Sequence, residues 1–180
     1  MIRRTVFYFE EPGPLNTEAV IEAVKERLKE GGARRVVVAS DSGETALRFC
    51  EALGGEAEVI AISWKEMDKD KLRALKARGV VAVEGAHTPL SVKERAGLRD
   101  AYYTLGQGFK VAVEVTLIAA DKGLVEVGEE IIAVGGTGKG ADTAVVVKAS
   151  STREMLRGVP ERRLEVKEII AMPLKKKWWE

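Results

Sequence analysis

The 180-residue sequence contains one cysteine, one histidine, one asparagine and one glutamine. Cys50 has no second cysteine with which to form an internal disulfide, which indicates a reducing compartment. Because His87 is the only histidine, a transition-metal site built from histidine and cysteine ligands is not expected, and we predict no metal. Asparagine and glutamine, whose side chains are thermolabile, are scarce, while 32% of the residues are charged. Both features are typical of a thermophile protein.

Long apolar runs and an excess of one charge are lacking too. No run approaches the roughly 20 residues of a membrane span, and the apolar stretch in "MIRRTVFYFEEPG" is shorter than that of a signal peptide. The 29 basic residues nearly balance the 28 acidic ones, whereas nucleic-acid-binding proteins usually carry a strong basic excess. We therefore expect a cytoplasmic protein that binds neither membranes nor nucleic acid.

The one local basic excess lies in "LKKKWWE" at the end of the sequence. We interpret it as a solvated tail. The alternative is that Trp178 and Trp179 pack on a partner subunit, which would make the protein a homo-oligomer or the partner of another enzyme.

Familiar catalytic motifs are also missing. The stretch "AVGGTGKGADTAVVV" looks like a phosphate-binding P-loop, but Lys139 is followed by Gly140 and not by the serine or threonine that places a hydroxyl on magnesium. Its third glycine comes one residue too early for a dinucleotide-binding motif. No Gly-x-Ser-x-Gly elbow supports a serine hydrolase. Phosphoryl transfer from ATP is therefore not expected.

Apolar β-rich runs alternate with helical patterns along the chain. Strands are predicted at residues 4–9, 35–39, 57–62, 80–84, 110–116, 130–135, 143–148 and 165–171, and helices at 17–30, 43–53, 68–78 and 91–105, with short helices near 117–122 and 151–156. Runs such as "RRVVVA" suit strands covered on both faces of a parallel sheet. The pattern predicts one α/β domain over residues 1–180, with further strands, some antiparallel, added at one edge. Ligands bind such sheets beyond the carboxyl ends of the strands.

The first candidate site is the stretch "SDSGET" after the predicted strand 35–39. Free N–H groups at a helix start and the helix dipole attract anions, and the serine and threonine hydroxyls could donate hydrogen bonds. An equally weighted alternative is a plain helix cap formed by Ser42 or Asp41. The candidate ligand residues are Ser40, Asp41, Ser42, Gly43, Glu44 and Thr45.

Two stretches carry a resemblance to a known family. "VVVASDSGETA" is similar to the loop of the pyruvate kinase C-terminal domain that grips an effector sugar phosphate, and "IIAVGGTGKGADTAVVV" is similar to the glycine-rich hairpin that closes over the same effector. With "VFYFEEPGPLNT", "VEVTLIAADKG" and "EVKEIIAMP", the chain resembles the small stand-alone pyruvate kinase alpha/beta-domain proteins over nearly its whole length. Residues 63–104 match least well.

The resemblance implies a three-layer α/β/α sandwich like the pyruvate kinase C-terminal domain, with a mostly parallel sheet and added antiparallel edge strands. It also implies that the protein is not a kinase, because the parent enzyme's catalytic residues lie on other domains. Stand-alone members are associated with FMN, so the predicted cofactor is FMN and a flavin-dependent oxidoreductase is one possible activity. The alternative is a regulatory module that senses a sugar phosphate without catalysis.

The resemblance to this family makes further residues candidates for binding the ligand. The glycine-rich stretch is a hairpin loop that would also cover the phosphorylated ligand, with glycine amides as an anion nest and Lys139 as a point charge. Glu114 interrupts an apolar strand, where a carboxylate is costly unless it is paired or faces a crevice. Thr116 and Asp121 would lie at the carboxyl end of that strand, in reach of a ring edge or ribityl hydroxyls. The residues expected here are Glu114, Thr116, Gly136, Thr137, Gly138, Lys139 and Gly140.

His87 follows the predicted strand 80–84, on the same crevice side. A catalytic histidine needs a carboxylate partner, and Glu84 is the near candidate. We favour the interpretation that His87 is an exposed loop residue.

Overall fold

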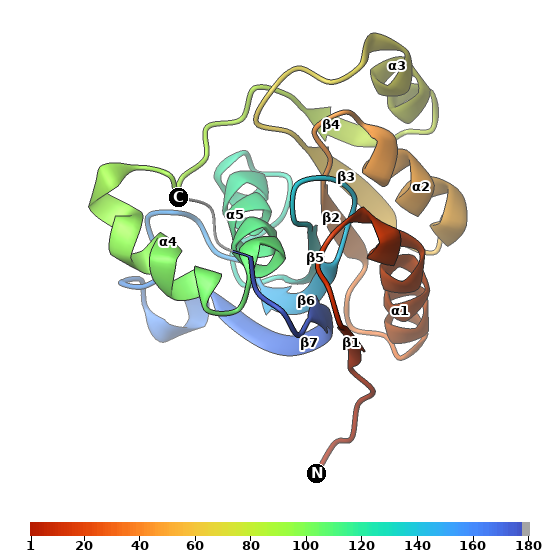
Figure 1. Cartoon of the computed structure of the whole chain (residues 1–180). Helices are drawn as coiled ribbons and strands as arrows, with labels where there is room; N and C mark the ends of the chain where they lie inside the picture. The colour runs from red at the N-terminus through yellow and green to blue at the C-terminus, as the bar shows by residue number, and fades with distance from the viewer. Residues whose placement is uncertain (178–180) are drawn as a thin grey trace.

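A seven-stranded sheet with helices on both faces organises the computed structural model, which describes residues 1–177 (Figure 1). The predicted α/β/α fold class is thereby confirmed. The strands are β1 (Phe7–Phe9), β2 (Arg35–Ala39), β3 (Glu58–Ile62), β4 (Val81–Val83), β5 (Glu130–Gly135), β6 (Thr143–Lys148) and β7 (Glu165–Pro173). The helices are α1 (Thr17–Lys29), α2 (Glu44–Leu53), α3 (Lys69–Ala77), α4 (Ala96–Tyr103) and α5 (Gln107–Asp121), with 3-10 turns at Pro14–Asn16, Lys93–Arg95 and Pro160–Arg162.

The strand order is β1-β7-β6-β5-β2-β3-β4. Strands β2, β3, β4 and β5 run parallel, β6 pairs antiparallel with β5 and β7, and β1 pairs parallel with β7. The chain builds outward from β2 to β4 and then returns to place β5 on the other side of β2. The neighbouring strands β2 and β5 therefore form a topological switch point, where open α/β sheets bind ligands beyond the strand ends.

Alternate residues of the central strands feed two cores, one on each face of the sheet. In β2, Val36 and Val38 belong to the core formed with α1 and α2, whereas Val37 belongs to the core formed with α5. This is the two-residue period of an extended strand. Figure 1 shows α1, α2 and α3 on one side of the sheet and α5, covered by α4, on the other.

The predicted strand at residues 110–116 is wrong, because these residues lie in the middle of α5. The stretch is rich in β-branched residues, which favour strands, but α5 is buried along most of its length between the sheet and α4. A helix that is apolar on nearly all sides is stable only when it is buried in this way. The short helix predicted near residues 117–122 is the end of α5.

Other differences are smaller. The predicted helix at residues 91–105 is a 3-10 turn followed by the shorter α4, and the short helix predicted near 151–156 is a series of turns. The predicted strand 4–9 begins three residues later, at Phe7. Among the described residues no helix is long and apolar enough to cross a membrane. The predicted contact of Trp178 and Trp179 with a partner lies outside the described residues.

An ion pair joins α1 to β7. Arg27 donates from Nε and Nη2 to the two carboxylate oxygens of Glu168, at 2.7 and 2.9 Å, and from Nη1 to the carbonyl oxygen of Gly31. The side chain of Arg27 is 8% exposed and that of Glu168 24%. The hydrogen bonds from Arg27 lower the pKa of Glu168 below its ordinary value of 4.5. Ionised Glu168 therefore stabilises the folded protein at neutral pH.

This pair predicts a pH dependence of stability. Because the folded pKa of Glu168 is depressed, its contribution is complete above pH 4.5 and is lost as the pH falls through the lowered value. We expect Glu168→Gln to reduce the free energy of unfolding by about 1–2 kcal/mol at pH 7. The difference from wild type should shrink on acidification. Urea unfolding between neutral and acidic pH measures both curves, and a difference that stays constant with pH would contradict this role.

Candidate functional site

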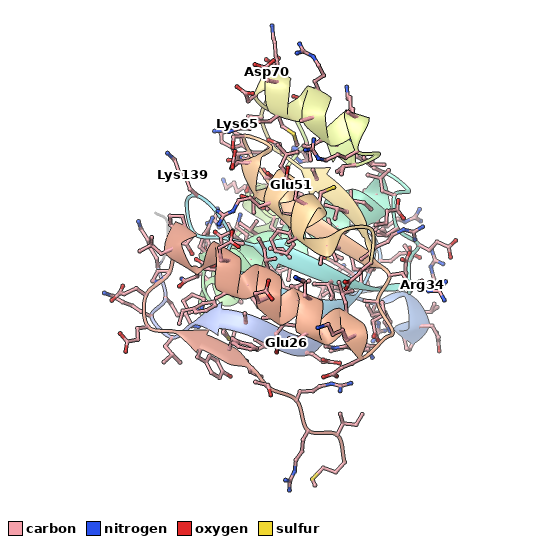
Figure 2. The ribbon with its side chains drawn as sticks, turned by 90° about the vertical axis from the view of Figure 1, so that its right-hand side faces the viewer. Glu26, Arg34, Glu51, Lys65, Asp70 and Lys139 are labelled. Carbon is pink, nitrogen blue, oxygen red and sulfur yellow. The ribbon has the colours of Figure 1, made fainter. Side chains whose placement is uncertain are left out.

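A cleft of about 950 Å³ lies at the switch point, beyond the carboxyl ends of β2 and β3. Most of its lining comes from the loops after β2, β3 and β5, from the start of α2 and from one face of α5. The volume falls in the range of pockets that hold cofactor-sized molecules. Figure 2 shows Lys139 and Lys65, which both line the cleft, at one end of the molecule, and Arg34, which precedes β2, at the other.

The structure brings most of the predicted site residues together in this cleft. Those that line it are Asp41, Ser42, Glu44, Thr45, Glu114, Gly136, Gly138, Lys139 and Gly140. The other four, which are Ser40, Gly43, Thr116 and Thr137, do not line it. Three of these four belong to the two loops of the cleft and shape them, as described next.

In the loop before α2, the predicted Ser42 accepts a hydrogen bond from the N–H of Glu44 at 3.4 Å, and Ser40 also caps the helix, while the carboxylate of Asp41 accepts from Trp64. Ser40 is 3% exposed, and its hydroxyl oxygen accepts a hydrogen bond from the N–H of Ala46 at 3.1 Å. Gly43 has a φ of +87°, in the left-handed region that favours glycine. Within residues 1–177 the N–H and hydroxyl of Thr45 make no hydrogen bond. A helix start with a free N–H and a free hydroxyl therefore faces the cleft.

Each acidic side chain that lines the cleft is paired with a lysine that also lines it. Asp41 accepts a hydrogen bond from the indole of Trp64 at 2.8 Å and lies 3.8 Å from the ammonium of Lys65. Glu44 pairs with Lys71 at 2.9 Å, a hydrogen bond that raises the pKa of Lys71. The third pair, between Glu114 and Lys110, is buried. Because these carboxylates are neutralised locally, they repel an incoming anion less than the sequence suggests.

Two further cations line the cleft. Arg48 pairs with Glu18, which lies outside the lining. Lys139 is exposed and has no ion pair within the described part of the chain. Figure 2 shows its side chain extending away from the body of the molecule. Lys139 is therefore free to move toward an anion held at the cleft.

The glycine-rich loop after β5 is held by Asp142, which is fully buried and which sequence reasoning missed. Its Oδ2 accepts hydrogen bonds from the N–H groups of Thr137 and Gly13, at 3.1 and 2.9 Å. On the loop's far side the N–H of Ala141 donates to the hydroxyl of Thr17 at 3.0 Å. These bonds fix both ends of the loop and leave its tip at Gly138, where a side chain would meet no atom within 4 Å.

The opposite wall of the cleft is a face of α5 that the strand prediction concealed. Val111, Val115 and Ile118 line its apolar part. The polar members of the same face are Gln107, Lys110 and Glu114. Their spacing of three and four residues is the helical period, which was the available signal in the sequence. A run of a dozen residues is also long for a strand and ordinary for a helix.

Glu114 and Lys110 form the buried polar centre of this wall. The carboxylate of Glu114 accepts a hydrogen bond from Lys110 Nζ at 2.8 Å and another from the N–H of Leu90 at 3.0 Å. The two side chains are 5% and 8% exposed. The expected pairing of this carboxylate is therefore observed, though on a helix.

Four residues singled out in the sequence do not line the cleft: Thr116, Asp121, Glu84 and His87. Thr116 does not end a strand: it is fully buried in α5 and donates its hydroxyl to the carbonyl oxygen of Ala112 at 2.9 Å. Asp121 accepts hydrogen bonds from Thr152. Glu84 accepts the N–H of Met67 at 2.7 Å, and His87 is exposed. In residues 1–177, no three or more His, Cys, Asp or Glu side chains are grouped so as to hold a metal ion.

Comparison with known proteins gives a family match and a weak similarity to a solved structure. Residues 18–147, more than half of the chain, match the family described as the pyruvate kinase alpha/beta domain. The pyruvate kinase of Cryptosporidium parvum, solved in complex with ADP, is 18% identical, with a TM-score of 0.44. That match covers 74% of this chain and 23% of the kinase, so this chain spans less than a quarter of the kinase's length.

Proposed function

The chain belongs to the pyruvate kinase alpha/beta-domain family, and from this premise we propose that its cleft binds FMN. The phosphate would lie at the start of α2, against the free N–H and hydroxyl of Thr45 and under the glycine-rich loop. The heteroaromatic ring would lie along α5. The observation that carries the proposal is the two-sided lining of the cleft.

The polar side of the cleft suits a phosphate. A helix N-terminus offers N–H donors and a positive dipole end to an anion. Ser42 and Thr45 add hydroxyl groups, and Lys139 adds a mobile positive charge. Because Ser42 and Ser40 accept the N–H groups of Glu44 and Ala46, the N–H and hydroxyl of Thr45 are not needed for capping.

The apolar side suits a flat ring. Val111, Val115 and Ile118 of α5 and Ile62 at the end of β3 provide the apolar lining. Trp64, which is 59% exposed, adds an aromatic surface beside the phosphate loop. A sugar phosphate would use the polar side alone, so this lining favours FMN over the alternative, a module that senses a sugar phosphate.

Bound FMN supplies hydride and one-electron transfer chemistry. The residues of this chain would hold its phosphate, orient its ring and exclude water from the α5 side. A flavin-dependent reaction is therefore part of the proposal. We also propose that the protein acts in the cytoplasm, which the single unpaired Cys50 supports.

The direct test is the absorption spectrum of the purified protein and a titration with FMN. We expect a yellow protein, or a colourless one that binds FMN and quenches its fluorescence, and release of the chromophore on denaturation. A protein that binds no FMN and is stabilised against heat by fructose 1,6-bisphosphate would overturn the proposal in favour of the sugar-phosphate sensor.

A variant at Thr45 tests where the phosphate lies. Thr45→Val keeps the shape of the side chain and removes its hydroxyl. We expect a loss of about 0.5–1.5 kcal/mol in FMN binding, and more if the bond is charge-assisted. Riboflavin, which has no phosphate, should bind wild type and variant alike.

The matched control is Thr104→Val, because Thr104 is exposed and lies outside the cleft. It should leave FMN binding unchanged. Unchanged affinity in both Thr45→Val and Ser42→Ala would show that the phosphate lies elsewhere.

A further inference from the structure

The carboxamide of Gln107 has a buried atom that the proposed function leaves without a role. Gln107 is the first residue of α5 and lines the cleft. Its Oε1 is buried and receives no hydrogen bond from any residue of the described range 1–177. Buried polar atoms in folded proteins are almost always paired, so such an atom requires an explanation. Because the residue lines the cleft, rotation about its terminal bonds would turn Oε1 from this buried position toward a donor on the ligand.

The neighbours of Gln107 on α5 restrict which ligand group fits. Lys110 lies three residues further along the same helix and also lines the cleft. Its ammonium has three N–H donors, of which one goes to Glu114 at 2.8 Å. This face of α5 therefore offers one amide, which both accepts and donates, next to an ammonium that donates.

An imide has the complementary pattern, because its N–H lies between two carbonyl oxygens. We propose that Gln107 recognises the imide edge of the ligand ring. Its Oε1 accepts the imide N–H, its Nε2 donates to one carbonyl oxygen, and Lys110 donates to the other. This rests on the proposed function, since it requires the ring to lie against α5. The ligand class is then a phosphorylated compound whose ring carries an imide.

Two such compounds are FMN, through its isoalloxazine, and the uracil nucleotides. Uracil is a single ring, whereas the apolar lining extends along α5 from Val111 to Ile118 and continues to Ile62. The extent of this lining favours the three-ring isoalloxazine.

The experiment compares FMN with N3-methyl-FMN, which lacks the imide N–H, in wild type and in Gln107→Leu. In wild type we expect the methyl group to weaken binding about tenfold, the effect of one buried hydrogen bond. In Gln107→Leu we expect FMN to bind about tenfold more weakly, and N3-methylation to change affinity less than twofold. The ratio of the two affinities is unaffected by a general loss of binding.

A matched control uses the same helix and the same cleft. Val111→Ala removes apolar contact from both ligands, so it should weaken both and leave the ratio near ten. The melting temperature of ligand-free Gln107→Leu should equal or exceed that of wild type, because an apolar side chain replaces a buried unpaired atom. A merely structural glutamine would show the opposite change.

The outcomes separate the two proposals. If wild type binds FMN tightly and N3-methyl-FMN equally well, the role of Gln107 is overturned and FMN binding stands. If uridine monophosphate binds more tightly than FMN while cytidine and adenosine monophosphates do not bind, imide recognition by Gln107 is supported and the proposal that the ligand is FMN is overturned. If neither FMN nor uridine monophosphate binds, both proposals are wrong.

Discussion

Alanine at position 135 is expected to destabilise the protein by about 3 kcal/mol or more, which is in the upper range of overpacking effects. Gly135 ends β5 at the point where the start of α5 crosses it. An added Cβ would lie 2.0 Å from the carbonyl oxygen of Gly108 and 2.8 Å from the backbone nitrogen of Ala112. Both are backbone atoms of α5, so relief requires the helix to move away from the sheet. Urea unfolding of the variant measures the loss.

The control is Gly123→Ala. Gly123 has a φ of +69°, but an added Cβ there meets nothing within 4 Å. Its cost is backbone strain alone, about 1–2 kcal/mol. If Gly135→Ala were no more destabilised than Gly123→Ala, α5 would not be held against β5 as closely as described. The FMN affinity of any folded Gly135→Ala protein should also fall, because α5 and the loop that follows β5 both line the cleft.

The second large effect is expected from Glu114→Ala, a loss of about 3–5 kcal/mol in the free energy of unfolding. The change removes two bonds at once. It leaves the ammonium of Lys110 buried without its carboxylate and the N–H of Leu90 without its acceptor. Thermal and urea unfolding at neutral pH measure the loss.

The double variant Lys110→Met with Glu114→Leu should recover most of that stability, because replacing a buried ion pair by apolar residues is often neutral. An exposed pair provides the contrast: Lys175 and Glu11 are 67% and 66% exposed, so Glu11→Ala should change stability little. A Glu114→Ala protein as stable as Glu11→Ala would mean that water reaches the Lys110–Glu114 pair freely.

The sheet was largely predictable because its strands carry their own pattern. The continuous apolar runs of β2, β5 and β6 are typical of strands that are buried on both faces, so the sequence alone indicates them. Helix α5 was not predictable in the same way. Its β-branched residues favour a strand locally, and only its packing between the sheet and α4 selects the helix. Attention to the Lys110–Glu114 spacing would have indicated a helix.

Part of the candidate site could be predicted from the sequence and part could not. The loop around Thr45 and the glycine-rich loop were found because each is a short contiguous motif. The α5 face was missed because its members are three and four residues apart within a segment given the wrong period. Asp142 was missed for another reason: it joins Thr137 to Gly13, which is 129 residues away from it in sequence. No local pattern marks a contact of that range.

The pairing of β1 has a consequence for how the protein forms during synthesis. Phe7 pairs with Ala171, and within the described sheet β7 is the only neighbour of β1. Almost the whole chain must therefore leave the ribosome before the first strand has a partner, and until then β6 exposes an unpaired edge. Such edges promote aggregation. Nascent chains arrested just before residue 165 should accordingly depend on chaperones far more than full-length chains, even though the residues that line the cleft have all been made by then.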